Sequence, residues 1–367
     1  MEANKGYGSE DIQHWDWHEH LRKRPGMYLG KLGDGSEKDD GIYVLFKEIV
    51  DNAIDEFNMG FGKSIDITLD EESKEVTVRD YGRGIPLDSL VISVGQINTS
   101  GKYGSDAYSK SGGLNGVGAK AVNATSTKFY AQSWRDGKSK WAYFEKGELK
   151  KEGELSNCRE KDGTLIKYTA DPTLYENYSY KIEYLDSMLK NYAYLNPGLT
   201  IHFNKTTYYS KNGLPDLISD NMTEPPLYSP IHLKGHDIEV VITHGRDSGE
   251  NIYSFANGQN TYHGIGCCIF LLVQILELFH SLQSQWGCGI IKSQHVGGDI
   301  HEYRTCNRVS LGNIRKQFGK DWTQQSGQYV YYAALLANLH QIRRPPCART
   351  NGSSPMRRYT RQAARTL

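Results

Sequence analysis

The chain has 367 residues, enough for two domains with sizeable cores, and its 43 basic residues balance 43 acidic ones. This balance excludes a global basic field of the kind that draws a protein onto nucleic acid. The polar N-terminus lacks the apolar core of a signal peptide, and the longest apolar run, CCIFLLVQILELF, is too short for a bilayer, which needs about 20 apolar residues. We therefore expect a cytoplasmic protein.

The composition changes near residue 262. From Tyr262 onward the chain has 13 basic and 4 acidic residues, together with five of the six cysteines. Adjacent Cys267 and Cys268 lack the spacing of zinc ligands. Two compositions in one chain indicate two origins. The cysteines, the scattered glycines and the arginine-rich end argue against a cooperative core from 262 to 367.

The first clear element is an amphipathic helix predicted at 42–59, where apolar residues recur at steps of three and four before Gly60 and Gly62. Glu48 and Asn52 are four residues apart, so they lie one above the other on one face of this helix. They belong to a solvated polar stripe, or they supply a carboxylate that orients water and an amide oxygen suited to Mg²⁺.

A β-hairpin is predicted next, because SIDITL and VTVRD alternate apolar and polar residues. The alternation points Asp80 to the side where the two valines are buried, which is costly unless the carboxylate meets a donor. Asp80 either caps the turn at Gly82–Gly84, or accepts from a ligand N–H such as the exocyclic amine of adenine. On the second interpretation the two glycines leave room for a flat base.

A helix is predicted at 88–98, a glycine- and serine-rich loop at 100–118 and the start of another helix at 119–124. The stretch SGGLNGVGAKAVNATS (111–126) packs four glycines into seven residues before small apolar ones. A glycine cluster that opens a helix is typical of phosphate-binding backbone. Its spacing fits neither G-x-x-x-x-G-K-[ST] nor G-x-G-x-x-G.

The remaining periodicity predicts a helix at 181–193 and strands at 128–134, 140–146, 163–170, 200–204, 236–244 and 251–258. The last two strands would belong to a second module. We expect an α+β fold with helices layered on one sheet.

Four segments together carry a family resemblance: EIVDNAIDE, RDYGRGIP, SGGLNGVGAKAVNA and DGT. In this order and spacing they resemble the GHKL (Bergerat) ATP-binding domain that gyrase, Hsp90, histidine kinases and MutL share. The leading LRKRPGMYLG narrows the resemblance to the B subunit of bacterial type IIA DNA topoisomerases. DDGIYVLFKEIVDNAIDEF and GGLNGVGAKAVNA are closer to topoisomerase IV than to gyrase, although the sequence does not fix which of the two applies. The resemblance runs from about Tyr7 to Thr261.

The resemblance implies a GHKL α/β sandwich followed by a truncated, ribosomal S5-like transducer and an atypical tail. The transducer is expected to be truncated because the family's G-G-T-H-type turn and its Q-T-K loop, whose lysine reaches the γ-phosphate, do not follow Thr261. No DNA-cleaving module is expected in this chain. A frameshift or fusion near Tyr262 is our hypothesis for the tail. The expected divisions are an arm at 1–20, the ATP-binding domain at 21–215, the transducer start at 220–261 and the non-family tail at 262–367.

The resemblance also implies roles for individual residues. Glu48 would be the general base for the attacking water and Asn52 a magnesium ligand. Asp80 would receive the adenine amine with the help of Thr164, and Arg83 would cover a base that lies on Gly84, Ile85 and Pro86. Tyr7 would reach into the partner's site, and Lys102 and Tyr103 would belong to a lid. Asn115 stands where gyrases have histidine, which alters one phosphate contact. The backbone that wraps the phosphates would be Gly113, Leu114, Asn115, Gly116, Val117, Gly118 and Ala119.

ATP and Mg²⁺ are the cofactors that the resemblance implies. The function would be that of an ATPase module in which ATP closes two B subunits into a clamp, while one DNA duplex passes through another. The partners would be a second B subunit, a DNA-cleaving A subunit and duplex DNA at the bacterial nucleoid. Because the transducer lysine is missing, a non-catalytic ATP-gated dimerisation module is the alternative. A histidine kinase is disfavoured, since only about 20 residues precede RKRPGMY and leave no room for a phospho-acceptor helix.

Two motifs near the N-terminus have alternative interpretations. HWDWHEH places His14 and His18 at i, i+4 spacing, but it is not H-E-x-x-H, so a metal site is the weaker hypothesis. The three cations before Pro25 in LRKRPGMY either face DNA or hold the structure together. We favour the structural role.

Overall fold

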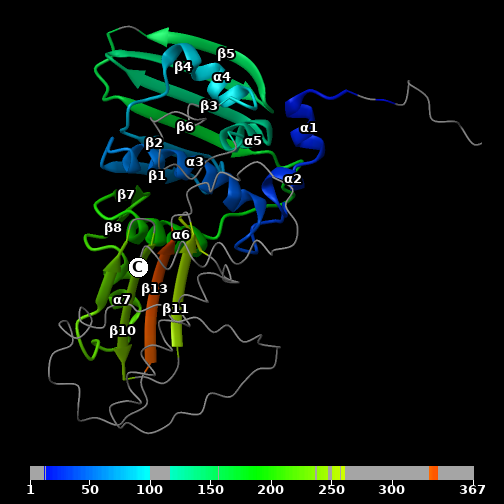
Figure 1. The fold of residues 1–367 in the computed structure, drawn as a ribbon. Coiled ribbons are helices and arrows are strands. Elements are labelled where there is room, and N and C mark those ends of the chain that lie inside the picture. Colours follow the sequence, from blue (N-terminus) through cyan, green and yellow to red (C-terminus); the bar gives the residue numbers. More distant parts are fainter. Residues whose placement is uncertain are drawn as a thin grey trace, which may run out of the picture. The chain divides into compact units, whose positions relative to one another are not determined.

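The computed structural model describes residues 12, 14–99, 116–155, 157–235, 238–246, 250–256, 258–260 and 330–337. It divides the chain into two compact units, Met1–Gly213 and Leu214–Leu367. Figure 1 draws both units, coloured along the sequence. In the part of the chain that is described, no helix has the length and apolar character needed to cross a membrane.

The first unit is built on an eight-stranded sheet in the order β5-β4-β3-β6-β2-β1-β7-β8. Neighbouring strands are antiparallel, except that β1 and β7 are parallel. The strands are β1 (Ser64–Leu69), β2 (Val76–Asp80), β3 (Ser126–Arg135), β4 (Lys138–Glu145), β5 (Glu148–Leu155), β6 (Gly163–Ala170), β7 (Thr200–Phe203) and β8 (Thr206–Tyr209).

Helices α3, α4 and α5 lie over this sheet (Figure 1). The predicted α+β fold with helices layered on one sheet is therefore confirmed. The predicted helix at 88–98 is shorter than expected, because it consists of a 3₁₀ turn followed by α4. The helices are α1 (Trp17–Lys23), α2 (Gly26–Leu29), α3 (Gly41–Asn58), η2 (Leu87–Ser89), α4 (Leu90–Gly95), α5 (Gly118–Ala124) and α6 (Ile182–Leu195).

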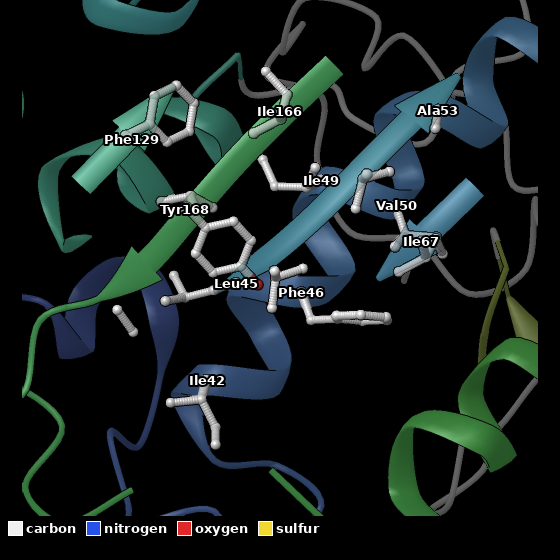
Figure 2. Packing of buried hydrophobic residues seen from close by; sticks show 14 of the residues in the cluster. Ile42, Leu45, Phe46, Ile49, Val50, Ala53, Ile67, Phe129, Ile166 and Tyr168 are labelled. Carbon is white, nitrogen blue, oxygen red and sulfur yellow. The ribbon is translucent and has the colours of Figure 1, made fainter. Parts of the chain in front are cut away.

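The core of the first unit lies between α3 and the central strands. Helix α3 buries the apolar face that its sequence period predicts, and the inward side chains of β1, β3 and β6 meet it (Figure 2). The two aromatic rings of Phe46 on α3 and Phe203 on β7 meet edge to face, with centroids 6.3 Å apart. Burial of this face fixes which side of α3 is left for chemistry. The buried residues labelled in Figure 2 are Ile42, Leu45, Phe46, Ile49, Val50, Ala53, Ile67, Phe129, Ile166 and Tyr168.

The second unit contains a five-stranded sheet in the order β12-β11-β13-β10-β9 and one described helix, α7 (Leu214–Asn221). Strand β13 comes from the part of the chain after Tyr262, and it pairs antiparallel with β10 and parallel with β11. The rest of the chain beyond residue 260 lies outside the described residues. The strands are β9 (Ile231–Lys234), β10 (Ile238–Gly245), β11 (Glu250–Ala256), β12 (Gln259–Asn260) and β13 (Val330–Ala337).

The basic motif LRKRPG has a structural role in the first unit. Arg22 donates from Nη1 to the carbonyl of Ala124 at 2.9 Å, at the end of α5, and from Nη2 to Asp171 at 2.6 Å. The Asp171 side chain is fully buried, and this ion pair together with the bonds from Thr173 lowers its pKa against the cost of burial. Lys23 pairs instead with Glu19 of its own helix at 2.8 Å.

Replacing Arg22 with alanine should therefore destabilise the first unit. The buried Asp171 carboxylate would keep only its bonds from Thr173 and the more distant Lys146, at 3.6 Å. Breaking a buried pair costs about 3 kcal/mol in comparable cases. Arg24 is exposed, so Arg24→Ala is the matched control, with an expected change within about 0.5 kcal/mol. Urea unfolding monitored by tryptophan fluorescence measures both variants. Equal midpoints for the two variants would contradict the structural role of Arg22.

Candidate functional site

One side of α3 carries a stripe of polar residues spaced four apart, Glu48, Asn52 and Glu56. This spacing puts them on successive turns, and eight residues of helix span about 12 Å. Asn52 donates from Nδ2 to the carbonyl oxygen of Glu48 at 2.7 Å, which orients its amide. The predicted helix that stacks Glu48 and Asn52 on one face is thus confirmed.

The N-terminal end of the stripe meets the first residue of α5. A methyl group added to Gly118 would lie 1.9 Å from Oε2 of Glu48, far inside any real contact distance. A side chain at 118 would displace this carboxylate from its position. The glycine-rich motif and the carboxylate on α3, far apart in the sequence, are therefore brought together.

Four of the predicted phosphate-binding residues are described. Gly116, with φ +61°, and Val117 lead into α5, whose first residues are Gly118 and Ala119. They place the end of the glycine-rich motif beside Glu48. The other residues predicted for this end lie outside the described residues: Tyr7, Lys102, Tyr103, Gly113, Leu114 and Asn115.

Asp80 ends β2 and is 7% exposed. Its Oδ1 accepts from the N–H of Gly82 at 2.9 Å and of Thr164 at 3.2 Å, whereas no hydrogen bond from the described residues reaches Oδ2. Burial raises the pKa of Asp80 to about 6, against the two N–H bonds and the charge of Arg79, which lower it. The predicted turn-capping role is confirmed, and it uses one carboxylate oxygen, so the second can serve a ligand.

Close packing of the protein explains why residues 82 and 84, after Asp80, are glycines. A methyl group on Gly82 would lie 2.6 Å from Cβ of Glu56, and one on Gly84, with φ +72°, 2.4 Å from the carbonyl of Trp134. Protein atoms fill the space that a side chain would occupy at both positions. Close packing is therefore one reason for these glycines, and room for a flat base beside them stays a prediction. They permit close packing of the turn.

Arg83 is held by a residue that the motifs did not single out. Its Nε and Nη2 donate to the two carboxylate oxygens of Glu56, each at 3.0 Å, and its backbone N–H donates to Oε2 at 3.0 Å. The guanidinium also lies over the ring of Phe61, 4.4 Å from its centroid. The signal for Glu56 was its place four residues beyond Asn52 in the same helical stripe.

The loop after Arg83 is tied to the neighbouring strands. Ser133 of β3 donates from Oγ to the carbonyl of Ile85 at 2.7 Å, and Arg135 donates from Nη1 to that of Gly84 at 3.4 Å. Pro86 follows and precedes η2. The three residues predicted as the floor, Gly84, Ile85 and Pro86, thus share one loop close to Asp80 in the sequence. Thr164 contacts Asp80 through its backbone N–H.

The histidine pair near the N-terminus does not share a helix, because α1 begins at Trp17 and His14 precedes it. Across the described ranges, no cluster of three His, Cys, Asp or Glu side chains could hold a metal ion by itself.

Comparison with known proteins places this geometry in a family. Residues 37–166 match the family described as histidine kinase-, DNA gyrase B- and HSP90-like ATPase. The chain is 46% identical over 332 residues to the B subunit of DNA topoisomerase 4 from Borreliella burgdorferi, a match that covers 88% of this chain and 55% of that protein. The sequence motifs predicted a resemblance only from about Tyr7 to Thr261, and this match is longer, so the similarity extends beyond that stretch. The chain is also 34% identical to the B subunit of DNA gyrase from Helicobacter pylori, over 71% of this chain and 36% of that protein.

The fold has a counterpart among solved structures. The 43K ATPase domain of Thermus thermophilus gyrase B, solved in complex with an aminocoumarin, aligns with a TM-score of 0.62 at 22% identity, over 88% of this chain and 81% of that chain. The chain spans about half the length of the curated relatives it matches. Residues 37–166 thus belong to the histidine kinase-, DNA gyrase B- and HSP90-like ATPase family, in a chain homologous to the B subunits of topoisomerase IV and gyrase.

Proposed function

We propose that residues 21–215 bind ATP with Mg²⁺ and hydrolyse it, as the ATPase module of a type IIA topoisomerase. The observation that carries the proposal is the stripe on α3, because Gly118 contacts one end of it and the turn after Asp80 contacts the other. The intervening helix spans about 12 Å, of the order of an extended nucleoside triphosphate. Both ends have the chemistry that such a ligand needs.

Adenine recognition is assigned to the Asp80 end. The second carboxylate oxygen of Asp80 would accept from the exocyclic amine, while Oδ1 stays bonded to the N–H groups of Gly82 and Thr164. A carboxylate with a pKa near 6 is mostly ionised at neutral pH and so accepts strongly. Arg83, fixed by Glu56, would cover the base, and the loop at Gly84–Pro86 would lie beneath it.

Phosphate binding and hydrolysis are assigned to the other end. Backbone N–H groups of 113–119 would hold the phosphates, and the amide oxygen of Asn52 would join phosphate oxygens and water around Mg²⁺. Bound Mg²⁺ would neutralise charge on the transferred phosphoryl group. Glu48 would accept the proton of the attacking water, since its carboxylate lies where Gly118 brings the glycine-rich segment close.

The activity of a whole enzyme is a wider proposal, because the curated relatives are about twice as long as the aligned part of this chain. We assign 1–20 to an arm that reaches a second copy and 220–261 to the start of a transducer. In the intact enzyme, nucleotide-driven closure of two B subunits would drive duplex passage together with a DNA-cleaving A subunit. A match that covers 88% of this chain must extend past Thr261, so a tail wholly foreign to the family from residue 262 to 367 is not part of this proposal.

A non-catalytic, ATP-gated dimerisation module is the second candidate. It is favoured by one observation, namely that no Q-T-K sequence occurs in the chain to supply a transducer lysine. Loss of one cation near the transferred phosphoryl group weakens turnover more than binding. The two candidates differ in phosphate release, not in nucleotide affinity.

Glu48→Gln separates these candidates. It removes the proposed base but keeps the shape of the side chain, so phosphate release should fall at least about 100-fold while binding persists. Release is measured with a phosphate sensor, and binding by the thermal shift with a non-hydrolysable ATP analogue and Mg²⁺. Glu71→Gln, an exposed acid at the β1–β2 turn, is the control and should change neither.

If wild type releases phosphate no faster than Glu48→Gln while both bind the analogue, the dimerisation module is the better account. If the analogue shifts the midpoint of neither protein, nucleotide binding itself is the wrong proposal.

Asp80→Asn should weaken nucleotide binding yet stabilise the nucleotide-free chain. Because burial raises the folded pKa of Asp80 to about 6 from 3.8, the folded chain holds a proton that the unfolded chain has released between these values. Stability therefore falls as pH rises through this window, and the full penalty remains above it. Asparagine avoids the penalty, so we expect a gain of about 3 kcal/mol at pH 8 and only about 0.5 kcal/mol at pH 4.

Unfolding curves at both pH values measure this change, and Asp88→Asn, at an exposed neighbouring acid, is the control. Analogue affinity should fall at least about 10-fold in Asp80→Asn, because a charged acceptor is lost. A variant that binds normally would remove Asp80 from the site.

A further inference from the structure

Directly behind the proposed adenine site, on the other face of the sheet, lies a buried arginine. Arg79 precedes Asp80 in β2, so the strand alternation sends its side chain to the face away from α3. It is 8% exposed, and its guanidinium lies 4.2 Å from the ring of Trp134 and 4.8 Å from that of Tyr81. These rings hold the planar group in one place.

The guanidinium joins the two chain segments that supply the Asp80 hydrogen bonds. Nη1 of Arg79 donates to the carbonyl of Asp80 at 2.6 Å, and Nη2 donates to the carbonyl of Lys161, also at 2.6 Å. Lys161 lies in the loop that enters β6, where the N–H of Thr164 binds the Asp80 carboxylate. The bridge therefore extends the β2–β6 ladder, which ends at Arg79 and Leu165, to the point where the carboxylate meets its donor.

Gly163, the glycine of the D-G-T motif, permits this bridge. It has φ +134°, and a methyl group there would lie 2.2 Å from the carbonyl oxygen of Asp80 and 2.5 Å from Nη1 of Arg79. Any side chain would push the guanidinium away from the Asp80 carbonyl. The motif glycine is therefore explained by the arginine bridge.

The charge of Arg79 is not neutralised by an ion pair with any described carboxylate, since both of its hydrogen bonds end on backbone carbonyls. Its field therefore acts on the buried Asp80, whose ionised form it favours, while Glu56 on α3 acts in the opposite direction. The other charged or titratable groups near the two residues are Asp66 on β1, Tyr81, Arg83, Arg135, Glu160 and Lys161.

We infer that Arg79 is a positioning residue for nucleotide recognition, which from the far face of the sheet fixes the Asp80 carboxylate against β6 and holds a positive charge behind it. The role in nucleotide recognition rests on the proposed function. Its physical content, the control of Asp80 by Arg79, does not require bound nucleotide. A planar fork bonded to two carbonyls is a task that lysine cannot reproduce.

Two variants separate the charge from the bridge. Arg79→Gln removes the charge, so the Asp80 titration midpoint should rise by about one pH unit. Arg79→Lys keeps the charge and should leave the midpoint within about 0.3 unit, but it loses the second carbonyl bond, so affinity for the analogue should fall several-fold. Lys167 of β6 lies on the same face of the sheet as Arg79. Lys167→Gln removes its charge and is the matched control, which should change neither the titration midpoint nor the affinity.

The midpoint is measured in the nucleotide-free full chain by carboxyl-carbon NMR of ¹³C-aspartate, with Asp80→Asn assigning the signal. Analogue affinity is measured by calorimetry at pH 6 and pH 8. An unchanged midpoint in Arg79→Gln, or an equal rise in Lys167→Gln, would overturn the role of the charge. Unchanged affinity in Arg79→Lys would overturn the bridge, and that variant decides the matter if Arg79→Gln does not fold.

The readouts also keep the inference separate from the proposed function. If wild type does not bind the analogue but Arg79→Gln still raises the midpoint, nucleotide binding is the wrong proposal while the control of Asp80 by Arg79 stands.

Discussion

The packing of α3 on the central strands is the constraint on which the site depends. One side of this helix is buried in the core, and the polar stripe at Glu48, Asn52 and Glu56 is carried on the other part of its circumference. Because the core fixes the rotation and register of the helix, it also fixes where the two ends of the stripe lie. Gly118 and the turn after Asp80 are built around those fixed points. The described ends of the site are therefore tied to the core.

The same region concentrates buried charge, which is costly in a folded protein. Asp80 accepts two N–H bonds, Glu56 and Arg83 form a two-bond pair, and Arg79 bonds two carbonyls. These partners reduce the cost of burial, although the raised pKa of Asp80 shows that for this carboxylate a penalty remains. The apolar contacts of α3 must offset that penalty. A site that binds well is thus a local weakness in stability.

Periodicity in the sequence was enough for the elements that have one buried face, such as α3 and the β1–β2 hairpin. It failed for β5, whose residues ELKKEGEL are almost all exposed, and for β8 at the other edge of the sheet. Edge strands are held by backbone pairing and often carry charged side chains on both faces, so their sequences show no alternation. The helix predicted at 88–98 is shorter in the structure, because its first turn is the 3₁₀ turn η2 and α4 ends at Gly95.

For the site, family motifs indicated which positions matter but not what they contact. Four motif glycines illustrate the difference, because at these four the space for a side chain is taken by another part of the protein. Such a motif records close approaches between chain segments, and a sequence cannot name the second segment when it lies far away or on the other face of a sheet. Glu56 and Arg79 went unnoticed for this reason, since Gly82, which contacts Glu56, was attributed to the ligand, and Gly163, which contacts Arg79, was given no role. The pairs are Gly82 with Glu56, Gly84 with Trp134, Gly118 with Glu48 and Gly163 with Arg79.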